Sequence, residues 1–220
     1  MNEKRAQFIW QFIYLASASP RRQELLQQIG VAFEVLPGAP AHEAEAMERV
    51  IAAESPSAYV RRVAVAKLDA ALDRRQRLAL PPAPILTADT TVALGGTILG
   101  KPVDAADAVR MLRALSGRTH RVLTAVALAH GTRRRVALSV SRVQFARLTP
   151  RQIEAYVATG EPFDKAGGYG IQGAAGAFAR RIEGSYSGIM GLPLYETARL
   201  LRGVIESPLV GGTHANDRAR

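Results

Sequence analysis

Residues 13–22 read Ile13-Tyr14-Leu15-Ala16-Ser17-Ala18-Ser19-Pro20-Arg21-Arg22, the pattern of a short buried strand that runs directly into a helix. Ser19 is a natural N-cap, and Pro20 suits the first helical position. Arg21 and Arg22 follow in the first turn, where the helix dipole favours acidic residues instead. Free backbone N–H groups, small hydroxyls and two guanidinium groups together suit a phosphate group. The alternative is a surface helix with solvated arginines.

Apolar and polar segments alternate along the rest of the chain in a way that favours an α/β fold. We expect strands at residues 13–16, 33–36, 85–88 and 92–94, and a hairpin made of 122–129 and 136–145. We expect helices at 21–28 and 57–74, from Asp104 to Gly117 and from Thr149 to Gly160, a loop at 37–45 and a frayed end at 211–220. The chain shows no internal repeat and no long linker.

The composition is that of an ordinary globular protein, with 220 residues of which 48% are apolar. No stretch has the length and apolarity of a membrane span, so we expect no membrane partner. The absence of cysteine excludes disulfides, thiolate metal sites and cysteine nucleophiles. We see no signal peptide, and together with the missing cysteines this leads us to expect a cytoplasmic protein.

The formal net charge of +10 attracts polyanions, either nucleic acid or small phosphorylated substrates. The basic residues are spread along the sequence, and aromatic residues make up only 6% of it. Because no basic face with interleaved aromatic residues emerges, we expect nucleic acid not to be a partner.

Asp89 lies in Ala88-Asp89-Thr90-Thr91, and the apolar pair Ile85-Leu86 places it at the end of a predicted strand. Ligands of α/β sheets bind at such strand ends. A carboxylate there can hold a metal or activate water. The alternative is an N-cap or an Asx turn.

Lys67 shares a helix face with Val60, Val63, Ala64 and Ala71, so its side chain is directed inward. Inward lysines are rare unless they are paired, and a phosphate or a carboxylate would pair this one. The alternative is that it extends past the small alanines to solvent. Because the rest of this face is apolar, we expect folding not to require the charge.

A glycine-dense segment spans residues 161–173. Its glycines allow close approach of the backbone to a ligand, and Gln172 offers the donors and the acceptor that suit a base edge. The alternative is a merely flexible loop. Lys101, in the turn Gly100-Lys101-Pro102, gives a weaker indication of phosphate contact. The histidines show no metal-ligand spacing, so a zinc site is not expected.

Taken together and in order, these segments resemble the Maf family of nucleoside triphosphate pyrophosphatases, from Ile13 to Val204. The resemblance rests on residues 15–22, the helix that carries Lys67, residues 88–91, 100–102 and 115–120, the run Asp164 to Gly173, and residues 184–194. It implies an α/β fold with a mixed, strongly curved central sheet flanked by helices, and two lobes around a cleft. We accordingly expect one domain over 13–205, with terminal extensions at 1–12 and 206–220.

The resemblance also implies an activity: cleavage between the α- and β-phosphates, with Mg²⁺ or Mn²⁺, to a nucleoside monophosphate and pyrophosphate. Family members are often homodimers, so a homodimer is expected. The run from Asp164 to Gly173 resembles the branch that acts on dTTP and UTP rather than the branch that acts on 7-methyl-GTP. A purine enzyme of the inosine-triphosphate type, and a nucleic-acid-binding division regulator with a vestigial cleft, are the alternatives.

Site roles follow from the resemblance position by position. Asp89 corresponds to the proton acceptor, and Arg22, Thr90 and Gln172 correspond to specificity positions. The remaining polar site positions of the family are matched by Lys67, which we expect to be catalytic together with Asp89, and by Ser17, Arg21 and Lys101, which we expect to bind the substrate. The family's acidic metal-binding loop is replaced here by residues 37–45, where we expect Glu43, or alternatively Glu45, to hold the metal together with Asp89.

Overall fold

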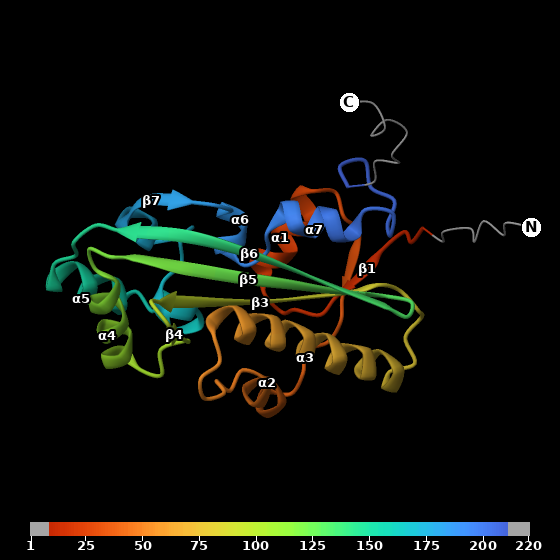
Figure 1. The fold of residues 1–220 in the computed structure, drawn as a ribbon, viewed down its shortest axis with the longest axis horizontal. Coiled ribbons are helices and arrows are strands. Elements are labelled where there is room, and N and C mark those ends of the chain that lie inside the picture. The colour runs from red at the N-terminus through yellow and green to blue at the C-terminus, as the bar shows by residue number, and fades with distance from the viewer. Residues whose placement is uncertain (1–8, 211–220) are drawn as a thin grey trace, which may run out of the picture.

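The computed structural model describes residues 9–210, so the segment 211–220, for which fraying is expected, lies outside the described residues. Seven strands form one sheet in the order β2-β1-β3-β5-β6-β7, with β4 paired to β3 (Figure 1). The strands are β1 (Ile13–Leu15), β2 (Phe33–Val35), β3 (Ile85–Leu94), β4 (Thr97–Leu99), β5 (Thr119–His130), β6 (Arg133–Phe145) and β7 (Ala179–Glu183). β1 is parallel to β2 and β3, and all other pairs are antiparallel. The predicted mixed α/β sheet is therefore confirmed.

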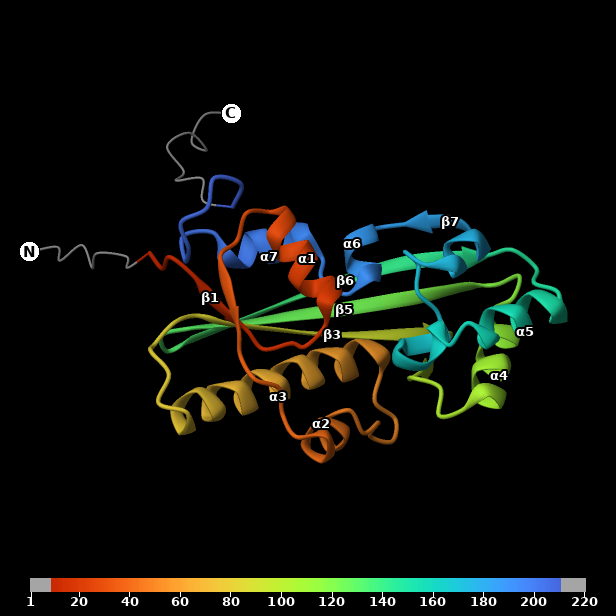
Figure 2. The same ribbon diagram turned by 180° about the vertical axis from the view of Figure 1, so that it is seen from behind.

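Helices flank the sheet on both faces. They are α1 (Pro20–Gln28), α2 (Ala41–Met47), α3 (Pro56–Arg77), α4 (Ala105–Leu115), α5 (Pro150–Ala158), α6 (Tyr186–Met190) and α7 (Leu194–Leu201). Three short 3₁₀ segments follow α5: η1 (Glu161–Asp164), η2 (Ala166–Gly168) and η3 (Ala174–Phe178). The long helix α3 covers one face of the sheet, whereas α1 and α7 cover the other, as the front and back views agree (Figures 1 and 2).

The buried apolar side chains form separate clusters, and these clusters define two lobes. In the first lobe, Leu15 and Leu26 belong to a cluster that packs against α7, and Val63 and Leu68 belong to a cluster beneath α3. The second lobe has its own cluster around Phe145, with side chains from α4, α5 and the segments after them. The long strands β3, β5 and β6 run through both lobes and connect them.

The predicted helix starts are largely confirmed. The Asp104 side chain accepts a hydrogen bond from the Asp107 backbone at 2.7 Å, and Thr149 and Gln152 form a reciprocal capping box. Ser19 occupies the N-cap position of α1 before Pro20, but its side chain makes no capping hydrogen bond.

Two local expectations are wrong. Residues 37–45 were expected to be a loop, yet α2 begins at Ala41, because the alanines and glutamates after Pro40 are helix formers and Pro40 ends the irregular segment. The apolar pieces 85–88 and 92–94 form a single strand, since Thr90 and Thr91 between them are β-branched and continue it.

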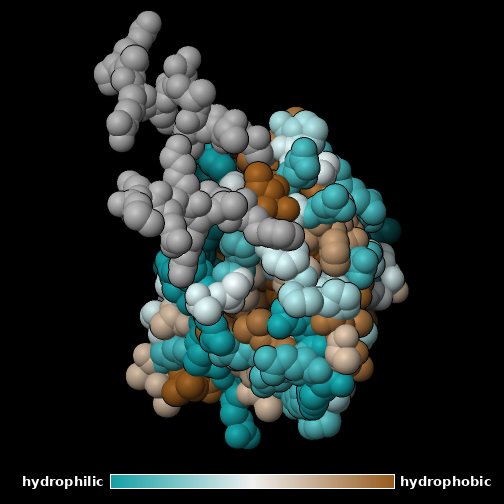
Figure 3. Space-filling model, turned by 90° about the vertical axis from the view of Figure 1, so that its right-hand side faces the viewer, coloured by the Kyte–Doolittle hydropathy of each residue, from teal (hydrophilic) through white to brown (hydrophobic). Residues whose placement is uncertain are grey.

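The two ends of the described chain meet on the first lobe. The Trp10 backbone N–H donates to the Val204 carbonyl at 2.8 Å, and the Glu206 N–H donates to the Trp10 carbonyl at 3.0 Å. Ser207 is buried, and its hydroxyl donates to the Ile29 carbonyl at 3.3 Å. Residues at both expected extensions thus belong to the packed structure. Figure 3 shows this end of the molecule, where hydrophobic and hydrophilic residues are interleaved.

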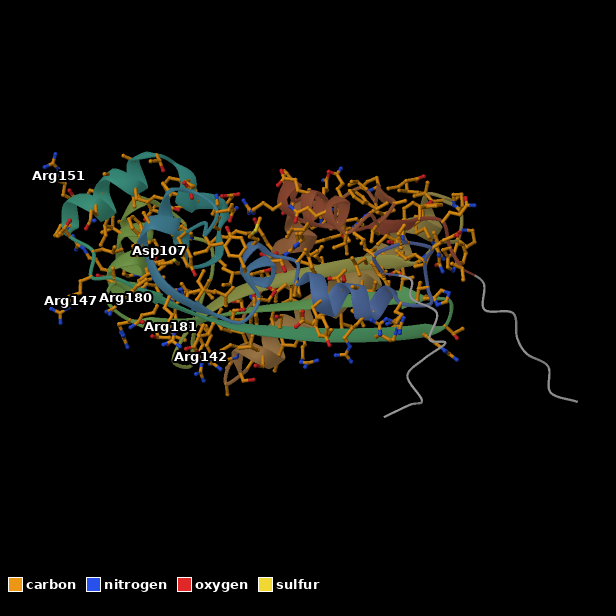
Figure 4. All side chains as sticks on the ribbon, turned by 90° about the horizontal axis from the view of Figure 1, so that it is seen from above. Asp107, Arg142, Arg147, Arg151, Arg180 and Arg181 are labelled. Atoms are coloured by element: carbon orange, nitrogen blue, oxygen red, sulfur yellow. The ribbon has the colours of Figure 1, made fainter. Side chains whose placement is uncertain are left out.

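Arginines that are far apart in the sequence gather at the outer edge of the second lobe, where β7 is the last strand. Figure 4 labels Arg142, Arg147, Arg151, Arg180 and Arg181 there, and all five are exposed. Arg181 forms an ion pair with Glu183 at 2.8 Å. Charged side chains on an edge strand oppose pairing with a strand of another molecule. Arg180 and Arg181 on β7 are placed for this structural role.

Candidate active site

A cavity of about 220 Å³ lies between the two lobes. It opens where β3 lacks a neighbour on one edge, because β1 pairs only with residues 85 and 86 of β3 and β4 pairs only with residues 92–94. The cavity brings together seven of the predicted site residues: Arg21, Arg22, Lys67, Asp89, Thr90, Lys101 and Gln172. Asp89 therefore lies at a gap in the sheet edge in the middle of β3, and not at a strand end as expected, because β3 is continuous.

Lys67 is paired with two carboxylates at the floor of the cavity. Its Nζ donates to Asp89 Oδ1 at 2.6 Å and to Glu48 Oε1 at 2.8 Å. This geometry follows from the pleat of β3: Thr87, two residues before Asp89, faces α3 and bonds the Ala64 carbonyl, and Lys67 lies one turn further along the same helix. Lys67 is thus an inward, paired lysine, and it does not extend to solvent past the alanines.

Glu48 is the site residue that sequence reasoning missed. The Tyr59 hydroxyl donates to the Glu48 carbonyl at 2.9 Å, and Lys101 Nζ lies 3.5 Å from Glu48 Oε2. Partial burial raises the pKa of Glu48, but the charges and hydrogen bonds of Lys67 and Lys101 outweigh burial and hold this pKa below its usual value. Burial of the Tyr59 hydroxyl, together with the negative charges of Asp89 and Glu48, raises the pKa of Tyr59 to about 12.

The two glutamates expected to bind a metal do not line the cavity. Glu43 lies on α2, where its Oε2 is 3.9 Å from Arg74 Nη2, and Glu45 lies on the same helix. Glu48 follows the end of α2 directly. The sequence did indicate that Lys67 needs a carboxylate partner. It did not show whether this partner is Glu43, Glu45 or Glu48, because that depends on the residue at which α2 ends.

Arg22 is held by three oxygen atoms. Its Nε donates to the Gly191 carbonyl at 2.9 Å, its Nη1 to Ser17 Oγ at 3.2 Å and its Nη2 to Thr90 Oγ1 at 3.4 Å. Burial lowers the pKa of Arg22, while the charge of Asp89 acts in the opposite direction. Ser17 does not line the cavity; it supports Arg22, which does.

Arg21 connects the first lobe to the loop of the second lobe across the cavity. Its Nη2 lies 3.6 Å from Asp164 Oδ2, and Lys165 Nζ also contacts Asp164. Burial raises the pKa of Asp164, but Lys165 and Arg21 together bring it below its usual value. An anionic ligand of the cavity would compete with Asp164 for Arg21.

Tyr169 anchors the loop that carries Gln172. Its hydroxyl lies 2.7 Å from His120 Nε2, and its ring packs edge to face against Phe145. Burial lowers the pKa of His120 to about 4 and raises the pKa of Tyr169. His120 is therefore a neutral residue of the core, held beside the Tyr169 hydroxyl.

The donors in the cavity fit a hard divalent cation shared with a ligand. Glu48 and Asp89 both direct an oxygen to the single cationic Nζ of Lys67, so two carboxylates already converge on one positive charge. Within residues 9–210 no group of three or more metal-ligating side chains occurs. Mg²⁺ commonly binds through one or two carboxylates and completes its shell with water and substrate phosphates, which is the arrangement these residues allow.

The fold and this cavity define an α/β protein in which cations surround two carboxylates, a lining that suits a small polyanion. The chain belongs to the Maf-like protein family, whose model matches residues 12–204. It is 61% identical to a dTTP/UTP pyrophosphatase of a Polaromonas species over 191 residues, which is 87% of this chain and 95% of that protein.

Two further relatives bear the same name. The chain is 63% identical to that of Ralstonia nicotianae (86% of this chain, 92% of the other) and 61% identical to that of Cupriavidus pinatubonensis (87% and 96%). Among solved structures, a HAM1 protein from Coxiella burnetii matches with a TM-score of 0.47 and 16% identity, covering 87% of this chain and 98% of that one. In the described part of the chain, no helix has the length and apolarity needed to span a membrane.

Proposed function

We propose that this protein is a nucleoside triphosphate pyrophosphatase that hydrolyses dTTP and UTP to the nucleoside monophosphate and pyrophosphate. The observation that carries the chemistry is the pair of carboxylates, Glu48 and Asp89, on Lys67 in a cavity lined by further cations. The choice of substrate rests on the relatives of 61–63% identity that are named dTTP/UTP pyrophosphatases.

In this proposal the cations of the cavity bind the triphosphate. Arg21, Arg22 and Lys101 come from α1 and from the turn after β4, so they approach the cavity from different sides. Guanidinium groups hold phosphate oxygens in a bidentate manner, and an ammonium group adds a point charge. Arg21 leaves Asp164 for the phosphate, because a multiply charged anion is a stronger partner than one exposed carboxylate.

Mg²⁺ or Mn²⁺ would be held by Glu48 and Asp89, in place of the Glu43 and Asp89 pair expected from the sequence. When bound, the ion neutralises charge on the phosphoryl group under attack. This choice of glutamate is supported by the position of Glu48 beside Lys67 and Asp89, whereas Glu43 contacts Arg74 outside the cavity.

Asp89 acts as the general base. It takes a proton from a water molecule whose oxygen attacks the α-phosphorus, while the bond between this phosphorus and the α–β bridging oxygen breaks. The electron pair of that bond goes to the bridging oxygen, which leaves with pyrophosphate. Lys67 orients the Asp89 carboxylate at 2.6 Å, and Lys101 and Arg21 neutralise the charge on the leaving group.

Gln172 recognises the pyrimidine edge, because an amide donates to one base atom and accepts from its neighbour. Thr90 contributes through Arg22, to which its hydroxyl is hydrogen-bonded. We further propose that the protein works as a homodimer in the cytoplasm, which light scattering and cell fractionation would test.

A substrate panel tests the proposal. Purified protein with Mg²⁺ or Mn²⁺ is given dTTP, UTP, CTP, GTP and ITP, and products are separated by anion exchange. We expect dTTP and UTP to be turned over fastest, with pyrophosphate as the product, and ¹⁸O from labelled water to appear in the monophosphate. Release of single phosphate would refute the cleavage site, a preference for ITP would favour the purine alternative, and no turnover of any nucleotide would favour a non-catalytic regulator.

A further inference from the structure

Two side chains outside the cavity brace the loop that carries Gln172. Tyr156 lies on α5 and is 3% exposed. Its hydroxyl donates to Glu161 Oε1 at 3.0 Å and accepts from the Gly170 backbone N–H at 3.1 Å. The Tyr156 hydroxyl thus joins the start of the loop to a point two residues before Gln172.

The same glutamate reaches past Gln172 on the other side. Glu161 Oε2 accepts from the Ala174 backbone N–H at 3.2 Å. Residues 170–174 are therefore held at both ends by one carboxylate, directly at Ala174 and through Tyr156 at Gly170. Within residues 9–210 the Gln172 side chain makes no hydrogen bond of its own, so its position depends on the backbone on either side.

The glycines of the loop make room for this carboxylate. A Cβ atom at residue 173 would overlap Glu161 Oε1, and one at residue 170 would lie 3.0 Å from the same oxygen. The φ angle of Gly173 is −100°, which any residue adopts, so the reason for glycine here is space and not conformation. The loop is packed around the Glu161 carboxylate, which contacts it at both Gly170 and Gly173.

We propose that Tyr156 and Glu161 are positioning residues that set the base selectivity of the cavity by fixing the place of Gln172. Neither side chain lines the cavity, so neither touches the substrate. The inference rests on the function proposed above for Gln172. It predicts that loosening the brace changes which base is preferred and leaves the phosphate contacts of Arg21, Arg22 and Lys101 as they are.

The test uses Tyr156→Phe and Glu161→Gln in the full-length chain, with Glu154→Gln on the same helix as the matched control. We measure kcat/KM for dTTP, UTP, CTP and GTP, inhibition by pyrophosphate, and Tm. In the two brace variants we expect the preference for dTTP over CTP to fall roughly 10- to 100-fold, since displacement of a positioning group by about 1 Å has effects of this size. We expect unchanged inhibition by pyrophosphate, and unchanged preference in the control.

A second pair of variants keeps the proposal falsifiable where the first variants fold poorly. Gly173→Ala displaces the Glu161 carboxylate without removing it, so it should reduce the preference in the wild-type background. In the Glu161→Ala background the three atoms nearest to this Cβ, which are Oε1, Cδ and Oε2 of Glu161, are absent, so Gly173→Ala should have no additional effect. If Gly173→Ala lowers the preference for dTTP over CTP equally in the wild-type and Glu161→Ala backgrounds, the proposal that it acts through Glu161 is overturned.

Two outcomes would overturn the inference as a whole. One is an equal fall for all four nucleotides together with weaker pyrophosphate inhibition, which indicates a general structural role. The other is an unchanged preference in both brace variants. Calorimetric Kd values for dTMP and CMP measure the same base preference without turnover. If wild-type protein binds dTMP more tightly than CMP but hydrolyses no nucleotide, the proposed function is refuted and the proposed role of Tyr156 and Glu161 is not.

Discussion

Replacement of Lys67 by methionine should destabilise the protein, contrary to the expectation from its apolar helix face. Lys67 Nζ contacts both Glu48 and Asp89, and Asp89 is only 5% exposed. Without the ammonium, two carboxylates face each other in a partly closed cavity. Removing one partner of a fully buried ion pair costs about 3–5 kcal/mol. Because the side chains of Lys67 and Glu48 are 20% and 31% exposed, we expect a loss of about 2–3 kcal/mol at pH 7.

The loss should depend on pH. In wild-type protein the pKa of Glu48 is lowered, so its ion pair stabilises the fold above the unfolded pKa and this contribution is lost as pH falls. In Lys67→Met, protonation of one carboxylate removes the repulsion, so folding is favoured as pH falls. The difference in the free energy of unfolding between the two proteins should therefore shrink between pH 7 and pH 4.

Urea unfolding at several pH values, without divalent metal, measures this difference. Lys101→Met is the matched control: Lys101 is 57% exposed and 3.5 Å from Glu48, so its removal should cost less than about 1 kcal/mol. Added Mg²⁺ should raise the Tm of Lys67→Met more than that of wild type, because it replaces the missing charge. An unchanged stability of Lys67→Met at pH 7, or a loss that does not vary with pH, would refute the reasoning.

Three further predictions follow from the same cavity and its surroundings. Asp89→Asn should lower kcat by about 10²–10⁴-fold with no loss of secondary structure by circular dichroism, and near-normal turnover would exclude Asp89 as the base. Gln172→Glu should change the order of kcat/KM among dTTP, UTP, CTP and GTP, because a carboxylate only accepts hydrogen bonds; an equal fall for all four would remove Gln172 from base recognition. Because burial lowers the pKa of His120 to about 4, the unfolded chain binds a proton there below pH 6.5 that the folded chain does not. The free energy of unfolding should hence decrease by roughly 3 kcal/mol from pH 7 to pH 4, and His120→Gln should lack this part of the slope.

Local patterns in the sequence were sufficient for most of the fold. The helix that begins at Asp104 and the one that begins at Thr149 are confirmed by their caps, and the mixed sheet is confirmed as the family resemblance implied. The loop expected at 37–45 failed because Pro37, Gly38 and Pro40 break regular structure, while the residues that follow form α2. A short helix with few apolar residues leaves little periodic signal.

The candidate site was only partly visible in the sequence. Seven predicted residues meet in one cavity, but the partner of Lys67 could not be selected, because Glu43, Glu45 and Glu48 differ only in where α2 ends. The brace formed by Tyr156 and Glu161 was invisible for another reason. Its hydrogen bonds join a helix to a loop, and no periodic pattern predicts such contacts.

The contact between Trp10 and residues 204–206 has a consequence for synthesis in the cell. At about 5–20 residues per second, a ribosome needs roughly 10–40 s to reach this partner after it has made Trp10. The elements of the second lobe, from β3 to β7, are contiguous in the chain and depend much less on its two ends. The second lobe can consequently begin to form on the ribosome. In the first lobe β1 can pair with β2 and β3 early, but the lobe closes only when α7 and residues 204–206 have emerged to complete its apolar cluster and to bind Trp10.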